Sequence, residues 1–255
     1  MTNNLLALGI KPAGSAIGGG VGDFLPHVAD LLQGSAKLGV VTEPDMEAVL
    51  ALKPEYIFIE EQFGGADRAK MEKIAPVVSM DLDEGTWREQ LLRVAKVVGK
   101  VPEAEAFNKA YEQKADRVRK LIKEKLGEGA TAMAIRVSAK EMRVQSTARP
   151  VGPIMFDDLK LLPAKGVGDI PATEPYAVIS KEVLPDFNAD VIFLIVNSDD
   201  NAKKAFAELE KNPVWTNLKA VKNKHVYALD GQKWLDYSSM GQSMAMDDME
   251  QLLSK

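Results

Sequence analysis

Few side chains in this sequence are of the types that perform catalysis. The chain has no cysteine, which excludes thiol nucleophiles, disulfides, iron–sulfur clusters and cysteine-based zinc sites. Its two histidines, His27 and His225, are isolated in the sequence from clusters of other metal-ligating residues. This disfavours a histidine-based metal site, and a serine–histidine–aspartate triad would have to use one of the two. We interpret both as structural or surface residues. The sequence favours binding over catalysis, and a two-lobed metal-dependent hydrolase is the alternative from another class.

A glycine-rich run at residues 17–24, IGGGVGDF, is a candidate phosphate loop. It lacks the Gly-x-Gly-x-x-Gly spacing, and Pro26 falls where a phosphate-capping helix would have to run. We therefore expect a flexible loop here and no nucleotide site.

Polar and aromatic side chains follow three predicted buried strands, YIFI (56–59), VIFLIV (191–196) and HVYALD (225–230). Open parallel sheets bind their ligands at the carboxyl ends of the strands. The residues beyond these ends, with an arginine from the loop QSTARPVG (145–152), are the candidate ligand-binding residues: Glu60, Gln62, Phe63, Asn197, Gln232, Trp234, Tyr237 and Arg149. The alternatives are ordinary core packing for the tryptophan and tyrosine, and a solvated side chain for the arginine.

The elements that must position these residues alternate between strand and helix, which is typical of an α/β fold with mostly parallel strands. Helices are predicted at 46–53, 67–75, 153–162, 202–209 and 240–255, and further strands at 77–80, 132–137 and 141–146. Thr86 and Glu89 have capping-box spacing, and the helix that they begin ends at Gly99. Pro102 then opens a helix of about 25 residues, long enough to reach between two lobes.

Composition and charge narrow the class of protein. The 255 residues are 46% hydrophobic and 27% charged, which is typical of a globular chain. No run approaches the roughly 18 apolar residues of a spanning helix. The 32 basic residues are scattered among 37 acidic ones, for a net charge of −5, and they form no basic stripe. We therefore expect no nucleic-acid partner.

An internal similarity hints at two related halves. When Glu47 is laid on Glu182, Glu55 falls on Asp190, Ile57 on Ile192 and Phe58 on Phe193. The identities are few, and helix–turn–strand units share such patterns in any case. Duplication and coincidence both stay open from the sequence.

Taken in order, these segments resemble a known family. TEPDMEAVLALKPEYIFIE, one long helix, RPVGPIMFDDLKL and NPVWTNLKAVKNKHVYALD are similar to the helical-backbone ABC-transporter solute-binding proteins for iron–siderophores and vitamin B12. The resemblance covers nearly the whole chain. It implies a non-catalytic monomer with two Rossmann-like lobes and a ligand cleft between them. On this basis we expect an N-terminal lobe at 1–100, a linking helix at 101–128 and a C-terminal lobe at 129–255.

The resemblance also implies a partner and a compartment. Such proteins deliver ligand to an ABC permease, docking through one acidic residue on each lobe, and the matching positions are Glu47 and Glu182. Each also has the simpler interpretation of an exposed helix charge. Family members carry a secretion signal, often with a lipid-modified cysteine, and a first strand. Neither is recognisable here, so we expect a chain that is truncated or begins at an internal methionine, with an N-lobe sheet that lacks that strand. The family resemblance implies that the full-length precursor is extracytoplasmic, either periplasmic or lipid-anchored to the cell membrane.

The chemistry of the candidate residues narrows the ligand. Ferric tris-catecholates are strongly anionic and require several convergent cations, whereas ferric hydroxamates are nearly neutral and suit aromatic walls with one arginine. Trp234, Tyr237 and Arg149 favour hydroxamate, and the resemblance places a ligand arginine at position 149. Arg136 and Arg143 keep ferric catecholate or citrate open if they face the ligand. Haem and cobalamin, which would need an axial ligand, are further alternatives. No resident cofactor is expected, because the siderophore supplies all iron ligands.

Overall fold

The chain divides into two units in the computed structural model, which describes residues 1–64, 67–81, 84–171 and 173–254, with only the backbone of 63 and 64. The first unit is Met1–Ala110 with Ser238–Met240, and the second is Tyr111–Tyr237 with Gly241–Lys255. The division falls inside helix α6 (Val101–Leu126), so the long helix predicted from Pro102 onward is present and belongs to both units. The two-lobed α/β fold with one long helix is thus confirmed.

The first unit contains two small sheets. In one, β1 (Gly14–Ile17) pairs parallel with β2 (Ala36–Val40), which pairs antiparallel with β3 (Glu43–Pro44). In the other, the predicted strands 56–59 and 77–80 pair parallel as β4 (Ile57–Glu60) and β5 (Val77–Met80). The helical segments of this unit are α1 (Thr2–Ala7), η1 (Ala29–Leu32), α2 (Met46–Leu52), α3 (Glu61–Gly64), α4 (Arg68–Met71) and α5 (Trp87–Val97).

Local chemistry explains where these elements start and turn. The predicted capping box is present, because the Thr86 hydroxyl accepts from the Glu89 amide and the Glu89 carboxylate accepts from the Thr86 amide. The glycine-rich run contains a hydrogen-bonded turn, in which the Gly18 amide donates to the Asp23 carbonyl at 2.9 Å. The core of the unit packs α5 against α1 and β5, through residues such as Leu5, Met80 and Leu91.

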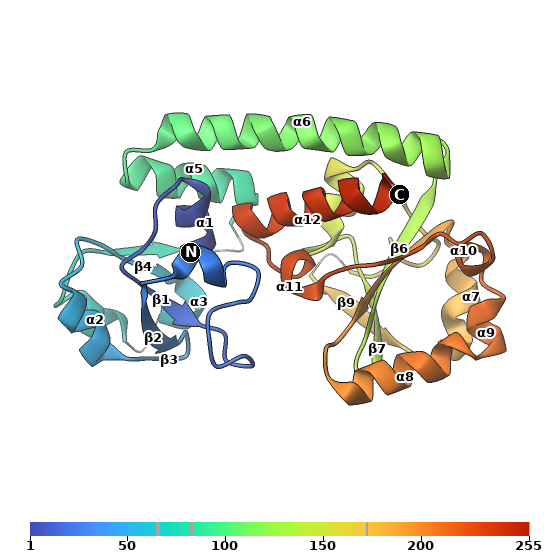
Figure 1. Cartoon of the computed structure of the whole chain (residues 1–255), viewed down its shortest axis with the longest axis horizontal. Coiled ribbons are helices and arrows are strands. Elements are labelled where there is room, and N and C mark those ends of the chain that lie inside the picture. Colours follow the sequence, from blue (N-terminus) through green and yellow to red (C-terminus); the bar gives the residue numbers. More distant parts are fainter. Residues whose placement is uncertain (65–66, 82–83, 172, 255) are drawn as a thin grey trace. The chain divides into compact units, whose positions relative to one another are not determined.

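The second unit is built on one mixed sheet, in the order β11-β10-β6-β7-β9. Strands β6, β7 and β9 of this sheet are labelled in Figure 1. Its strands are β6 (Thr131–Val137), β7 (Met142–Gln145), β9 (Tyr176–Ile179), β10 (Val191–Val196) and β11 (Val226–Ala228), with β8 (Leu162–Pro163) pairing on β6. The continuous apolar run VIFLIV is the interior strand β10, which is buried on both faces and parallel to both neighbours.

Helices cover this sheet and close the unit. They are η3 (Lys181–Val183), α7 (Leu184–Phe187), α8 (Asp200–Glu210), α9 (Pro213–Thr216), α10 (Lys219–Lys222), α11 (Gly231–Trp234) and α12 (Ser239–Leu253). The predicted helix at 153–162 is wrong in its length. Only a π-helical turn, η2 (Pro153–Asp158), forms, because Lys160 adopts a left-handed conformation (φ 59°) that a right-handed helix does not accommodate.

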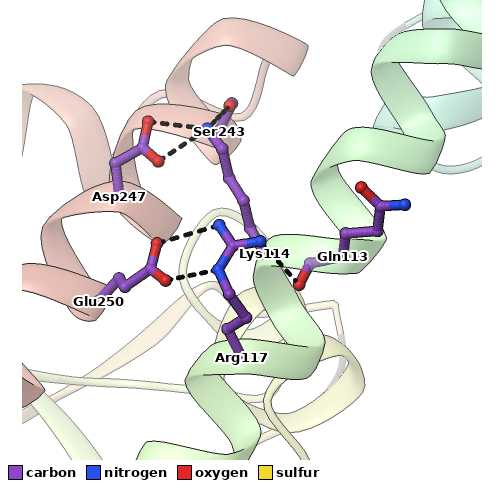
Figure 2. Close-up of polar contacts among 6 residues, drawn as sticks. All are labelled: Gln113, Lys114, Arg117, Ser243, Asp247 and Glu250. Carbon is purple, nitrogen blue, oxygen red and sulfur yellow. Dashed lines mark hydrogen bonds and ion pairs between the residues drawn. The ribbon is translucent and has the colours of Figure 1, made fainter.

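Ion pairs join α12 to α6 within the second unit (Figure 2). Lys114 Nζ lies 2.7 Å from Asp247 Oδ1, and Arg117 donates to both carboxylate oxygens of Glu250, at 2.6 and 3.2 Å. Met249 and Leu253 of α12 are completely buried. The predicted closing helix is therefore a core element of this unit.

The first residue of the final helix α12, Ser239, belongs to the first unit and forms hydrogen bonds there. The buried side-chain oxygen of Asn4 accepts from the amide of Ser239 at 3.1 Å and from its hydroxyl at 2.9 Å. Both residues are almost completely buried, so residues from the two ends of the sequence complete one another's hydrogen bonding.

The two segments that resemble each other in sequence have the same local structure. In each, a short helical segment ends in a left-handed residue, Lys53 (φ 48°) after α2 and Asn188 (φ 43°) after α7, and a parallel strand follows. Lys53 and Asn188 also coincide when Glu47 is laid on Glu182.

Candidate ligand-binding site

The clearest contact among the predicted ligand residues joins Arg149 and Tyr237 in the second unit. The guanidinium carbon of Arg149 lies 5.0 Å from the centre of the Tyr237 ring, within cation–π range. Both side chains are partly exposed. The pair therefore places a cation that carries hydrogen-bond donors over a partly exposed aromatic ring.

The loop that carries Arg149 is fixed at both ends. Ser146, directly after β7, donates its hydroxyl to the Glu174 carbonyl at 2.7 Å and accepts from the Ala148 amide at 3.0 Å. At the other end, the Gly152 amide donates to the Ala148 carbonyl at 3.0 Å. A β-carbon on Gly152 would lie 2.0 Å from the Thr147 carbonyl oxygen, so only glycine allows this close approach. The peptide bond between Arg149 and Pro150 is cis.

Two further arginines lie next to each other on one face of the sheet of the second unit. Arg136 on β6 and Arg143 on β7 are directly opposite each other in the antiparallel register. The guanidinium of Arg143 lies 4.0 Å from the centre of the Tyr176 ring and pairs with Glu141. Arg136 Nε donates to the neutral amide oxygen of Asn197 at 2.9 Å.

The electrostatics of this pair favour an anion. Burial, and then the positive charge of Arg143, lower the pKa of Arg136 from its usual range. Two like charges on adjacent strands repel each other. The Glu141 carboxylate, which pairs with Arg143, offsets part of that repulsion, and a further negatively charged group would relieve more of it. Asn197, predicted as a ligand residue, thus lies in contact with Arg136. Tyr176, whose ring contacts Arg143, was not among the predicted ligand residues, because the short run YAVI of β9 gave no clear strand signal in the sequence.

Trp234 does not line a surface, contrary to the prediction. Its side chain is completely buried, and its ring stacks on Phe193 of β10 with centroids 6.2 Å apart. Phe193 stacks in turn on Tyr227, at 6.0 Å. Such aromatic stacks are large contributors to a core. The interpretation as core packing therefore holds for the tryptophan, while Tyr237, three residues later, remains partly exposed.

The remaining predicted ligand residues make contacts within their own units. In the first unit, Glu60 Oε1 lies 3.4 Å from the N-terminal amine of Met1, and Gln62 Nε2 donates to Asp81 Oδ1 at 2.8 Å. Phe63 is in α3, and its side chain lies outside what the structure describes. In the second unit, Gln232 is exposed on α11, near the Asp230 side chain that caps this helix.

The two predicted docking residues, Glu47 and Glu182, are both exposed. Glu47 lies in the first turn of α2, whose amino end is capped by the Asp45 carboxylate accepting from the Ala48 amide at 2.9 Å. The backbone amide of Glu182 itself and the Ser180 hydroxyl lower the pKa of the Glu182 carboxyl. Each unit thus displays a carboxylate in the first turn of a short helical segment.

Within the part of the chain that the structure describes, no cluster of three histidines or carboxylates is arranged to hold a metal ion. No helix among the described residues is both long and apolar enough to cross a bilayer. The two-lobed α/β fold with one long helix matches that of a solute-binding protein.

Comparison with known proteins agrees. The profile of the family described as periplasmic binding protein matches residues 25–233, and the chain belongs to this family of non-catalytic solute-binding proteins. It is 30% identical over 98% of its length to the probable siderophore-binding lipoprotein YfiY of Bacillus subtilis, and 33% identical over 72% to the iron(3+)-hydroxamate-binding protein FhuD of that organism. It spans 78% and 58% of the lengths of these relatives. The structure of Staphylococcus aureus SirA is similar, with a TM-score of 0.84, 25% identity and coverage of 99% of this chain and 95% of SirA.

Proposed function

We propose that this chain binds a ferric siderophore of the hydroxamate type outside the cytoplasm and delivers it to an ABC permease for iron uptake. The contact between Arg149 and Tyr237 carries the proposal. A ferric hydroxamate is nearly neutral and has an apolar periphery, so it suits an aromatic face. A guanidinium held over the tyrosine ring can donate hydrogen bonds to the hydroxamate oxygens.

The names of the relatives support this assignment. One is called siderophore-binding and the other hydroxamate-binding, and the first is called a lipoprotein. In the proposed complex the siderophore supplies every iron ligand. The protein supplies shape, stacking and hydrogen bonds, and no covalent bond is made or broken.

A second ligand class is favoured by the pair of Arg136 and Arg143. These two cations on adjacent strands, with Tyr176 beside them, suit the carboxylate or catecholate oxygens of an anionic ferric siderophore. The burial of Trp234 removes one aromatic wall from the argument for hydroxamate. The two candidates therefore rely on different arginines, which makes them separable by mutation.

The experiment measures binding of ferrioxamine B, ferric citrate and a ferric tris-catecholate by isothermal titration calorimetry. For a hydroxamate protein, Arg149→Ala weakens ferrioxamine B binding about tenfold or more, and Arg136→Gln has little effect. For the anionic class, Arg136→Gln weakens binding of the citrate or catecholate complex instead. Arg93→Ala, which removes an exposed arginine paired with Glu84 in the first unit, is the control. Absence of binding to all three complexes would overturn the proposal.

Docking to the permease is proposed through Glu47 and Glu182. Both carboxylates are exposed, one on each unit, and arginines of the permease are their expected partners. The double variant Glu47→Ala/Glu182→Ala is expected to bind ferric siderophore normally but to lose uptake in cells that express the cognate permease. Glu208→Ala, which removes an exposed carboxylate of α8, should leave uptake intact. Normal uptake by the double variant would exclude this docking mode.

A further inference from the structure

A buried hydrogen bond ties the long helix to the turn that follows the Arg149 loop. Tyr111 of α6 donates its hydroxyl to Asp158 Oδ2 at 2.7 Å. Tyr111 is 1% exposed and Asp158 is 7% exposed. A buried carboxylate without a donor is strongly disfavoured, so this bond keeps Asp158 in one position.

A second contact from α6 holds the backbone of the same residue. Arg119 Nη1 donates to the Asp158 carbonyl at 2.6 Å. Arg119 is itself oriented by Glu112 and Asp116, because its Nη2 lies 2.7 Å from a carboxylate oxygen of each. The last residue of η2 is therefore bound to α6 through its side chain and through its carbonyl.

Little freedom remains between this anchor and Arg149. The residues Val151, Ile154 and Met155 are at most 1% exposed. The Met155 amide donates to the Val151 carbonyl at 3.3 Å. The close approach of Gly152 to the Thr147 backbone also restricts the loop around Arg149. Short π-helical turns are rare and often occur at functional sites. The segment from Ser146 to Asp158, which carries Arg149 near its amino end, is thus held by hydrogen bonds at both ends.

We propose that Tyr111 and Arg119 are positioning residues for ligand binding, which hold η2 so that Arg149 stays over Tyr237. The inference rests on the proposed function, because it assumes that Arg149 contacts the ligand. It adds a role for α6 beyond joining two units. Through Asp158, the long helix sets the position of Arg149, which lies nine residues earlier in the chain.

A double-mutant cycle tests the proposal. Ferrioxamine B is titrated into the wild type, Tyr111→Phe, Arg149→Ala and the double variant by calorimetry. Tyr111→Phe is expected to weaken binding about threefold to tenfold. In the Arg149→Ala background the same change should matter less than twofold, because its effect passes through Arg149. Asp158→Asn, which keeps an acceptor for Tyr111, should weaken binding less than Asp158→Ala.

Lys114→Ala is the matched control on the same helix. It removes the contacts of α6 with Ser243 and Asp247 of α12 but leaves η2 untouched (Figure 2). We expect unchanged affinity in both backgrounds, with thermal unfolding recorded for every variant. If Tyr111→Phe weakens binding equally with and without Arg149, the positioning role is overturned and Tyr111 serves stability alone.

Failure of the proposed function gives a different pattern. If Arg149→Ala leaves ferrioxamine B binding unchanged, Arg149 is not a ligand residue, and the positioning role falls with it. If the wild type binds only an anionic ferric complex, the cycle is repeated with that complex. Coupling between Tyr111 and Arg149 then supports the positioning role although the hydroxamate assignment has failed.

Discussion

Arg149 and Tyr237 come from distant parts of the sequence, yet the guanidinium of one lies 5.0 Å from the ring centre of the other. The arginine belongs to a loop braced by Ser146 and Gly152, and the tyrosine follows α11. Stacking on an aromatic ring limits the movement of a guanidinium. The contact therefore orders a flexible side chain before ligand arrives, which reduces the entropy lost on binding.

The aromatic ring of Tyr237 should be needed, and its hydroxyl should not. Tyr237→Phe keeps the face under Arg149 and is expected to bind ferrioxamine B within about twofold of the wild type. Tyr237→Leu removes the cation–π contact, worth about 0.5–1 kcal/mol, and should weaken binding several-fold. Calorimetric titration of both variants checks this. Equal affinity of the leucine variant and the wild type would contradict it.

Gly152→Ala should disturb the Arg149 loop. The new β-carbon would lie 2.0 Å from the Thr147 carbonyl oxygen, so the backbone must shift, and we expect a loss of about 1–3 kcal/mol of unfolding free energy. Gly168→Ala is the control, since a β-carbon there meets nothing within 4 Å. Guanidinium chloride unfolding compares the two. The prediction fails if both substitutions are equally neutral.

Trp234 should contribute to stability and not to ligand contact. Trp234→Ala removes a fully buried ring stacked on Phe193 and is expected to lower the free energy of unfolding by about 3–5 kcal/mol. Trp234→Phe keeps part of the stack, so it should cost less and leave siderophore affinity unchanged. Denaturant unfolding and calorimetry measure the two effects. A tenfold loss of affinity in a well-folded phenylalanine variant would restore the ligand role first expected for this residue.

Asp190 should make stability depend on pH in the acid range. Burial alone would raise the pKa of its carboxyl, but hydrogen bonds from Lys219 and from the amide and hydroxyl of Thr131 outweigh burial and lower the pKa to about 2. The ordinary value is 3.8. A depressed pKa stabilises the fold above the ordinary value, and that contribution is lost as the pH falls towards 2.

The variant Asp190→Asn isolates this effect. At pH 6 it should be less stable than the wild type by about 1 kcal/mol, after allowance for solvent screening of a partly exposed group. The difference should shrink between pH 3.8 and about 2. Urea unfolding at several pH values measures it, with the exposed Glu208→Gln as the control. A difference that stays constant down to pH 2 would contradict the assignment.

The sequence predicted most of the elements whose signals are local. The apolar run of β10, the capping box of α5 and the spacing of α6 each appear as expected. The length of η2 was wrong because Lys160, which stops it, has no residue-type signal for a left-handed conformation. Strand β9 was not predicted, because the extended conformation of its four residues depends on pairing with β7 rather than on their own sequence pattern.

Prediction of the site was harder, because side-chain burial is decided by tertiary packing. Trp234 and Tyr237 have similar sequence surroundings, yet one is buried against Phe193 and the other contacts Arg149. The alternation along β7 does place Arg143 and Gln145 on one face. That Arg143 lies opposite Arg136 follows only from the antiparallel register, which needs the turn between the strands to be known.

The two hydrogen bonds between Asn4 and Ser239 limit how the chain can be divided into separately expressed fragments. Expressing residues 1–110 alone would leave the amide oxygen of Asn4 enclosed without its two donors, a loss of about 1–3 kcal/mol for that fragment. Half-proteins made by a single break within α6 should therefore be poor reagents for studying each lobe in isolation. Circular permutation that keeps residues 238–240 next to the N-terminal segment offers a sounder starting point.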